Sequence, residues 1–237
     1  MTEAQPLAGD VAVLLESDPA WTPHLAAGLA EAGAKVVVAG GSWHGADMTL
    51  GGRFEAEADV AQAIAKIESR LARPRLLVTG PMRPVFSHSE DSDDSLVASA
   101  MAGVQRTYRW NRILGSRMAG AGGGAIVNFA FGFAERGVVG ASAFAMSQAS
   151  IVAATRSLAI EWASKKVRVC GIGLGWYETE QRPLEEQQKE RLVRFLPLRR
   201  KGAPSDAIGL MVYLASGAAG FVSGQTVWVD GGAMAHA

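Results

Sequence analysis

The chain has 237 residues, of which 49% are hydrophobic and 19% charged, a balance typical of one soluble α/β domain, which we place at residues 1–237. Lysine plus arginine and aspartate plus glutamate both total 23, so no positive excess points to nucleic acid or an anionic membrane as a partner. No apolar stretch is long enough to cross a bilayer and the N-terminus is polar and acidic, so we expect a cytoplasmic protein without a membrane segment.

Short apolar runs typical of strands alternate with helical patterns along the chain. The expected strands are 11–15, 35–39, 75–79, 125–130, 167–172 and 226–229. The expected helices carry Leu25 and Leu29, then residues 60–71, 93–118, 142–164 and 208–215. This alternation predicts an α/β fold, a mainly parallel sheet with helices on both faces. Residues 183–198, charged and bracketed by prolines, break the rhythm and predict a mobile helical flap over a cleft.

Histidine and cysteine show no pattern of a metal-binding or reactive site. Cys170 is the only cysteine and lies in an apolar strand pattern, which excludes an internal disulfide and is typical of a reducing compartment. His24, His44 and His88 do not have the spacing of metal ligands. We therefore interpret the histidines as surface or loop residues and expect no metal site.

The C-terminal part of the chain carries a specific motif. Residues 198–206 and 213–216, followed by Val222-Ser-Gly-Gln-Thr-Val-Trp-Val-Asp-Gly-Gly232, resemble the final helix and strand of the classical short-chain dehydrogenase/reductase family. Residues 124–128, the helix from Ser142 and the loop at 175–179 extend this resemblance over nearly the whole chain. It implies a single Rossmann-like, doubly wound domain with a mainly parallel seven-stranded sheet.

Three side chains carry the chemistry of the resembled family. A Tyr exchanges a proton with the alcohol, a Lys four residues on lowers the pKa of that Tyr, and a Ser orients the substrate. Here Phe144 falls at the Tyr position, Gln148 at the Lys position and Phe131 at the Ser position, and the family's Asn falls within residues 101–103. Phenylalanine has no titratable proton and neutral glutamine supplies no charge. We therefore expect these positions to be degenerate and the chain to hold no catalytic residue.

The glycine-rich turn that the family uses for its cofactor is also replaced. Glu16, Ala20 and Thr22 take the places of the three glycines between the first strand and helix, where the backbone would approach a pyrophosphate. Glu16 and Asp18 add negative charge there, and a carboxylate about 4 Å from a phosphate costs on the order of 4 kcal/mol. This turn predicts that the chain itself binds no cofactor.

The turn after the fourth expected strand differs from the family as well. It reads Thr79-Gly-Pro-Met82 where the family has Asn-Asn-Ala-Gly, so the thioether of Met82 stands in place of a glycine that lines the cofactor cleft. We interpret Asp59 as a helix N-terminus and place Arg53 or Phe54 at the adenine-contacting position. Degenerate cofactor positions are thus expected at both Thr79 and Met82.

The resemblance implies that the subunit-docking surfaces are kept. In the family two long helices and the last helix and strand pack between subunits, which here correspond to residues 93–118, 142–164 and 204–230. Buried interfaces persist where they still carry energy. We therefore predict a non-catalytic (pseudoenzyme) subunit of a heterotetrameric short-chain dehydrogenase. An active paralogue would bind NAD and oxidise a hydroxyacyl substrate, with a CoA-linked compound of aromatic degradation as the implied case.

Two other interpretations stay open. An enzyme with nicotinamide-independent chemistry would use Tyr177 as a surrogate acid, or Glu178 beside it. A ligand-binding regulatory protein would hold an apolar molecule between Phe131, Phe144 and Trp176. A basic cluster predicts either a solvated helix face or a contact with an anion such as a CoA phosphate. It comprises Arg191, Arg194, Arg199, Arg200 and Lys201.

Overall fold

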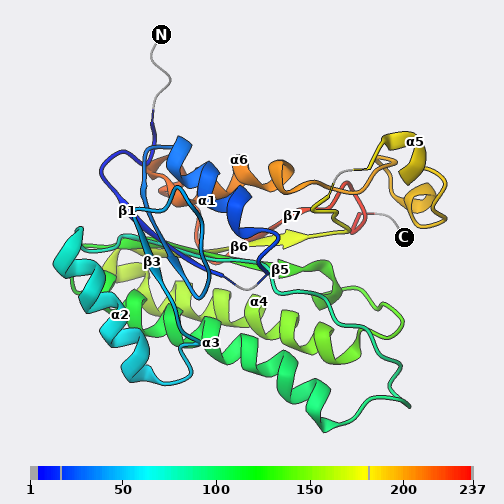
Figure 1. Ribbon diagram of the computed structural model, residues 1–237, viewed down its shortest axis with the longest axis horizontal. Helices are drawn as coiled ribbons and strands as arrows, with labels where there is room; N and C mark the ends of the chain where they lie inside the picture. The colour runs from blue at the N-terminus through cyan, green and yellow to red at the C-terminus, as the bar shows by residue number, and fades with distance from the viewer. Residues whose placement is uncertain (1–4, 17, 181, 236–237) are drawn as a thin grey trace.

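Seven parallel strands form one sheet in the computed structural model, which describes residues 5–16, 18–180 and 182–235. Their order is β3-β2-β1-β4-β5-β6-β7 (Figure 1). The strands are β1 (Val11–Leu15), β2 (Lys35–Ala39), β3 (Met48–Leu50), β4 (Leu76–Thr79), β5 (Gly124–Phe131), β6 (Val167–Leu174) and β7 (Thr226–Val229). The predicted doubly wound α/β fold is confirmed. The ends of the predicted range, residues 1–4 and 236–237, lie outside the described residues.

Helices cover both faces of the sheet, with α1 and α6 on one face and α2, α3 and α4 on the other (Figure 1). Their bounds are α1 (Thr22–Glu31), α2 (Glu57–Arg70), α3 (Asp94–Ala119), α4 (Ser142–Trp162), α5 (Leu184–Gln187) and α6 (Pro204–Ala215). α4 buries the predicted stripe that contains Ile151, Leu158 and Trp162. Two apolar layers result, because the strands of a doubly wound sheet are buried on both faces.

The strand β3 was not among the expected apolar runs. It has three residues, and only Met48 and Leu50 are buried while Thr49 between them is exposed. Such a short alternation carries too little signal to be separated from a loop. Its pairing with β2 completes the seven strands.

Residues 183–198, the predicted helical flap, lie in a segment from 182 to 201 that has little helix. Only α5 and one turn of 3-10 helix at Val193–Phe195 are helical, and Figure 1 shows the segment projecting from the sheet at the right. Lys201 Nζ lies 2.8 Å from Glu178 Oε1 and 2.6 Å from Glu190 Oε2, and Arg182 pairs with the same two carboxylates. Ion pairs and prolines therefore shape this segment more than helical hydrogen bonds do.

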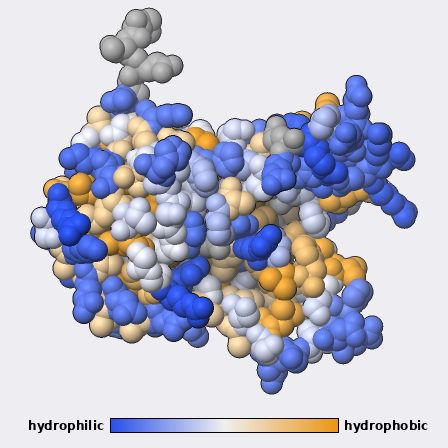
Figure 2. Space-filling model, in the orientation of Figure 1, coloured by the Kyte–Doolittle hydropathy of each residue, from blue (hydrophilic) through white to orange (hydrophobic). Residues whose placement is uncertain are grey.

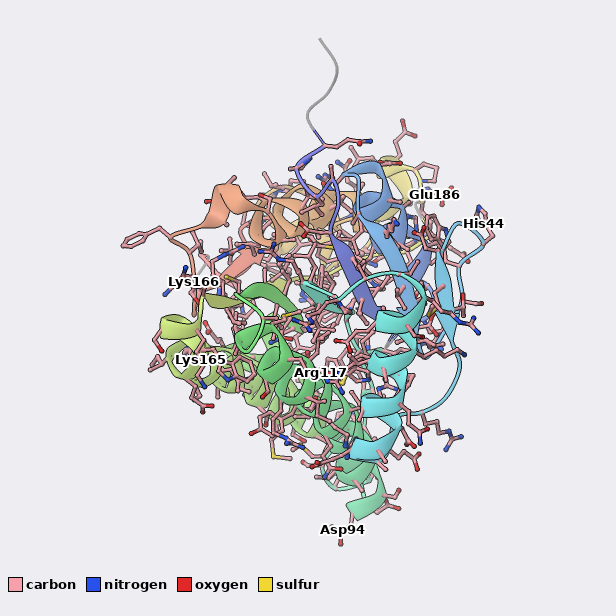
Figure 3. The ribbon with its side chains drawn as sticks, turned by 90° about the vertical axis from the view of Figure 1, so that its left-hand side faces the viewer. His44, Asp94, Arg117, Lys165, Lys166 and Glu186 are labelled. Carbon is pink, nitrogen blue, oxygen red and sulfur yellow. The ribbon has the colours of Figure 1, made fainter. Side chains whose placement is uncertain are left out.

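The helix α3 extends well beyond the sheet. It begins after Asp93, whose carboxylate accepts hydrogen bonds from the N–H groups of Ser95 and Leu96 and caps the helix. Figure 3 shows α3 running from Asp94, at the lower margin, to Arg117 beside α2. There Arg117 Nη1 lies 2.8 Å from Glu68 Oε2 of α2. Because this contact with α2 lies near the C-terminal end of α3, residues of its N-terminal half can line a cavity.

A buried polar network ties the centre of the sheet to the two long helices. The Asn128 side chain of β5 accepts hydrogen bonds from the Thr79 hydroxyl and the Asn111 amide, both at 3.0 Å, and donates to Thr155 Oγ1 at 3.0 Å. All four side chains are buried. The network fixes α3 and α4 against β4 and β5, because each polar group inside the core needs its partner.

Asn128→Ala is expected to lower the free energy of unfolding by about 2–4 kcal/mol, since it leaves the donors of Thr79 and Asn111 buried without an acceptor. Urea denaturation followed by circular dichroism measures the loss. Ser150→Ala, on the exposed side of α4, should change the stability by no more than about 0.5 kcal/mol. Equal effects of the two substitutions would contradict the role of the network.

Candidate functional site

The candidate site lies at the carboxyl edge of the sheet, beside the neighbouring strands β1 and β4, whose following helices α1 and α3 lie on opposite faces. Ligands of doubly wound sheets bind at this edge, beside the point where the strand order reverses. Figure 2 shows the molecule hollowed on its right side, between the hydrophilic lobe of segment 182–201 and a lower rim that carries hydrophobic residues. Val85 and Phe86 of the β4–α3 loop and Val139 of the β5–α4 loop are exposed apolar residues. The residues after β1, β4 and β5 therefore decide what this site can bind.

Aromatic rings fill two of the positions that were predicted to be degenerate, those of Phe131 and Phe144. The Phe131 and Phe144 ring centroids lie 5.6 Å apart, and Phe133 packs against both at 5.8 and 6.0 Å. Trp176 lies 5.1 Å from Phe133, and Phe86 joins from the β4–α3 loop at 5.8 Å from Phe133. We call these five residues the aromatic cluster. Phe131 and Phe144 meet as predicted, whereas Phe133 and Phe86 were missed, because no motif marks an added ring.

Gln148 is a buried bridge between α4 and the end of β5. Its Oε1 accepts a hydrogen bond from the Phe131 N–H at 3.0 Å, and its Nε2 donates to Ser147 Oγ at 3.0 Å. Its side chain has no exposed surface. Ser147 Oγ in turn donates to the Phe144 carbonyl at 2.6 Å. The Gln148 amide thus forms its hydrogen bonds with Phe131 and Ser147 inside the protein and does not face the open cleft.

Met82 and Gly103 are in close contact. A Cβ atom at Gly103 would collide with the Met82 sulfur, so only glycine fits there while Met82 keeps this position. Gly103 lies within the range predicted to match the family's Asn, and Met82 is one of the predicted degenerate cofactor positions. The two replacements therefore share one space, a link that the sequence does not reveal because 21 residues separate them.

The turn after β1 brings a carboxylate to the start of α1. Glu16 Oε2 accepts a hydrogen bond from the Thr22 hydroxyl at 2.6 Å, and a Cβ at Gly41, after β2, would collide with the same carboxylate. The N-terminus of a helix favours a negative charge. Ala20 lies on the exposed turn before α1, where its N–H donates to Asp18 Oδ1 at 3.1 Å. Glu16 and Thr22 thus come together, and Ala20 stays apart from them.

The residues at the end of β4 and after β3 have structural contacts. Thr79 belongs to the buried network of Asn128. Phe54 is buried, with its ring 5.1 Å from Trp110, while Arg53 is exposed. Asp59 Oδ2 accepts from the Ala56 N–H at the start of α2, so its interpretation as a helix N-terminus is confirmed.

Tyr177 and Glu178, the candidates for altered chemistry, are both engaged. The Tyr177 hydroxyl donates to the Val229 carbonyl at 2.7 Å, and its ring lies 5.2 Å from Trp21. Burial, followed by the charges of Asp206 and Asp230, raises the pKa of the Tyr177 phenol far above its usual range. A hydrogen bond from Arg182 is the main cause that lowers the pKa of Glu178. Neither group is placed to exchange a proton near pH 7.

The basic cluster at 191–201 is partly neutralised within the chain. Arg200 forms a two-pronged ion pair with Asp206, at 2.7 and 2.8 Å, and Lys201 contacts Glu178 and Glu190. Paired charges of this kind attract an external anion weakly. The anion contact predicted for the cluster is therefore not supported at Arg200 or Lys201.

No group of three metal-binding side chains occurs within residues 5–16, 18–180 and 182–235. Figure 3 shows His44 in the β2–β3 connection, far from Asp94 at the start of α3. Among the helices of these same residues, none has the length and apolar character needed to span a membrane.

Comparisons with known proteins place this geometry among related chains. Residues 23–234 match the family model described as enoyl-(acyl carrier protein) reductase. Nodulation protein G of Azospirillum brasilense is 29% identical over 203 residues, which cover 81% of each chain. (2S)-[(R)-hydroxy(phenyl)methyl]succinyl-CoA dehydrogenase subunit BbsC of Thauera aromatica is 27% identical over 241 residues, or 96% of each chain. A crystal structure from Sinorhizobium meliloti 1021, of a protein classed as a short-chain alcohol dehydrogenase, has a TM-score of 0.86 at 26% identity and covers 98% of this chain and 99% of that one.

Proposed function

The chain belongs to the short-chain dehydrogenase/reductase family, and from this premise we propose that it is a non-catalytic subunit of a hetero-oligomeric, NAD-dependent dehydrogenase. An active paralogue in the same heterotetramer binds NAD and oxidises the substrate. The observation that carries this proposal is the aromatic cluster, in which Phe131 and Phe144 pack together. The resemblance to the family matches these two residues to its catalytic Ser and Tyr.

The side chains at the catalytic positions support an inactive site. A proton-transferring group contributes a factor of roughly 10²–10⁴ to the rate, and the phenyl ring of Phe144 has no proton to transfer. Gln148 is fully buried and bonded to the Phe131 N–H. It therefore supplies neither a positive charge nor a contact to a ribose.

The residues after β1 do not fit the pyrophosphate of a dinucleotide. The Glu16 carboxylate lies over Gly41, accepts from Thr22 and is held at the start of α1. That is the position at which a glycine-rich turn would present backbone N–H groups to phosphate. A fixed negative charge there repels phosphate, which supports the proposal that the partner subunit, and not this chain, binds NAD.

Apolar side chains on the docking elements support an oligomer. Ile160 of α4 is 81% exposed, and Phe221, before β7, is fully exposed. Tyr108 of α3 and Tyr213 of α6 also face outward, and β7 is the last strand of the sheet, an edge that commonly pairs with another chain. The relative from Thauera aromatica carries the word subunit in its name. A hydroxyacyl-CoA substrate of aromatic degradation for the complex rests on that likeness alone.

The isolated chain is expected to bind NAD⁺, NADH, NADP⁺ and NADPH with a Kd above about 1 mM. Repulsion of roughly 4 kcal/mol by the Glu16 carboxylate corresponds to about a thousandfold loss of affinity. Isothermal titration calorimetry of the isolated chain, with an active family member as positive control, measures this directly. Micromolar binding of any of the four nucleotides would remove the basis of the proposal.

An enzyme with nicotinamide-independent chemistry is the alternative function, but no contact of Tyr177 or Glu178 favours it. Turnover by the isolated chain that Tyr177→Phe abolishes would establish this alternative. A cytoplasmic location is part of our main proposal and is supported by Cys170, which is a free and buried thiol.

A further inference from the structure

A cavity of about 640 Å³ opens between α3 and the loops that follow β3 and β4. Such a volume lies within the range of small-molecule sites. Its lining combines four arginines with a single carboxylate, that of Glu55, so the charge of the wall is strongly positive. The arginines are Arg53, Arg83, Arg106 and Arg109. This arrangement is distinct from the basic cluster at 191–201, and its members come from three separate segments of the chain.

The side of the cavity that α3 forms is apolar at one end and cationic at the other. Along α3 its lining begins with Leu96, Ala100 and Gly103 and continues with Arg106 and Arg109. At 1.5 Å per residue, the distance from Leu96 to Arg109 along the helix is about 20 Å. Met82 and Phe144 line the cavity as well. An occupant that satisfies both ends is therefore an amphipathic molecule with a negative head.

The guanidinium groups are held at the cavity without strong internal partners. Arg109 Nη1 donates to the Phe54 carbonyl at 2.8 Å, a neutral acceptor that fixes the group and leaves its charge unpaired. The Arg106 Nε is buried and meets no acceptor within the described part of the chain. The Arg53–Glu55 ion pair is 3.7 Å long and highly exposed, and such pairs hold little energy.

Burial lowers the pKa of the Arg106 guanidinium, and the nearby Glu16 carboxylate acts in the opposite direction. Arg106 is half-buried, and its buried Nε–H without an acceptor is costly for the protein unless an anion completes its hydrogen bonds. Arginine is suited to this role because its planar fork matches a phosphate or a carboxylate.

We propose that this cavity binds a small organic anion with an apolar body. Its phosphate or carboxylate head contacts Arg106 and Arg109. Its body packs against Leu96, Met82 and Phe144. The cavity includes Met82 and Phe144, two of the degenerate positions of the proposed function, so the proposal rests on that function and names a ligand for the same cleft.

Phenyl phosphate and phenylacetate are the probes, and titration calorimetry with thermal unfolding of the full chain is the measurement. At least one probe should bind and raise the melting temperature. Arg106→Gln and Arg109→Gln should each weaken that binding about tenfold or more, because a charge-assisted hydrogen bond is lost. The stronger of the two probes identifies the head group as phosphate or carboxylate.

Arg112→Gln is the matched control, since Arg112 lies on the same helix but pairs with Glu57 and does not line the cavity. It should leave binding unchanged. Ala100→Leu, which adds volume to the cavity wall without touching a charge, should weaken binding as well. Failure of both probes to bind, equal loss with Arg112→Gln, or equal binding of the neutral 2-phenylethanol would each overturn the proposal. Binding of NAD⁺ would instead count against the proposed function, so the two failures are distinguishable.

Discussion

Gln148→Lys, which installs the residue that the family carries at this position, is expected to lower the free energy of unfolding by about 3–5 kcal/mol. The site is fully buried, and the aromatic cluster next to it offers no counter-charge to an ammonium. The cost of burying the charge cannot exceed the cost of deprotonating the lysine, because the buried amine can lose its proton. For an ordinary pKa of about 10.4 that cost is about 4.6 kcal/mol at pH 7. Losing the hydrogen bond to the Phe131 N–H adds to it.

The destabilisation should depend on pH in a defined direction. The introduced amine is neutral in the folded state and protonated in the unfolded state, so the unfolded chain binds more protons and stability rises with pH. Between pH 7 and 10 the deficit relative to the parent chain should shrink by up to about 1.4 kcal/mol per pH unit. Urea denaturation at several pH values measures this slope.

Two variants separate the charge from the lost hydrogen bond. Gln148→Met removes the bond to Phe131 without adding a charge, and should cost about 1–3 kcal/mol with no dependence on pH. Gln188→Lys, at an exposed position of the segment after α5, should leave stability nearly unchanged. A fully stable Gln148→Lys chain would mean that position 148 opens to solvent, as it would in an active cleft.

Substitution of Ile160 and Phe221 by glutamate is expected to raise the Kd for the partner subunit by roughly 10²–10³-fold. Each side chain is apolar and almost wholly exposed in the isolated chain, and central interface residues of this kind contribute about 2 kcal/mol or more each. A buried glutamate would also carry an unpaired charge into the interface. Co-expression with an active paralogue, followed by pull-down and size-exclusion chromatography, measures the change.

Val139→Glu is the matched control for the interface. Val139 is 79% exposed, but it lies in the loop before α4, outside the proposed docking surfaces. Its substitution should leave the complex intact. A stable homotetramer that binds no relative would overturn the proposed hetero-oligomer. Disruption of the complex by Val139→Glu to the same degree would overturn the proposed docking surfaces.

Local patterns allowed most of the fold to be predicted from the sequence. Buried parallel strands read as continuous apolar runs, so β1, β2 and β5 were located within a residue or two. β3 was missed because three alternating residues are no signal. Residues 183–198 were predicted to be more helical than they are, because the ion pairs around them join residues far apart in the chain. The resemblance to the family predicted a seven-stranded sheet, whereas the apolar runs indicated only six strands.

The sequence named residues of the candidate site but did not show most of their contacts. Counting along the motif brought Phe131, Phe144 and Gln148 together, and the structure places them in contact. The sequence could not show that Gln148 bonds to the Phe131 backbone or that Met82 covers Gly103. It also did not show that four arginines surround one cavity, since they are spread over residues 53–109. The absence of a cofactor and the partner subunit stay predictions.

The contact between Met82 and Gly103 bears on the history of this chain. An asparagine at position 103 would collide with the Met82 sulfur and fits only if the Met82 side chain moves aside. A lysine at position 148 would be buried beside the aromatic cluster without a counter-charge. Reversal at either position therefore depends on a change in its neighbours. A library designed to recover an ancestral enzyme from this chain would have to vary these positions together, because stepwise reversion passes through less stable intermediates.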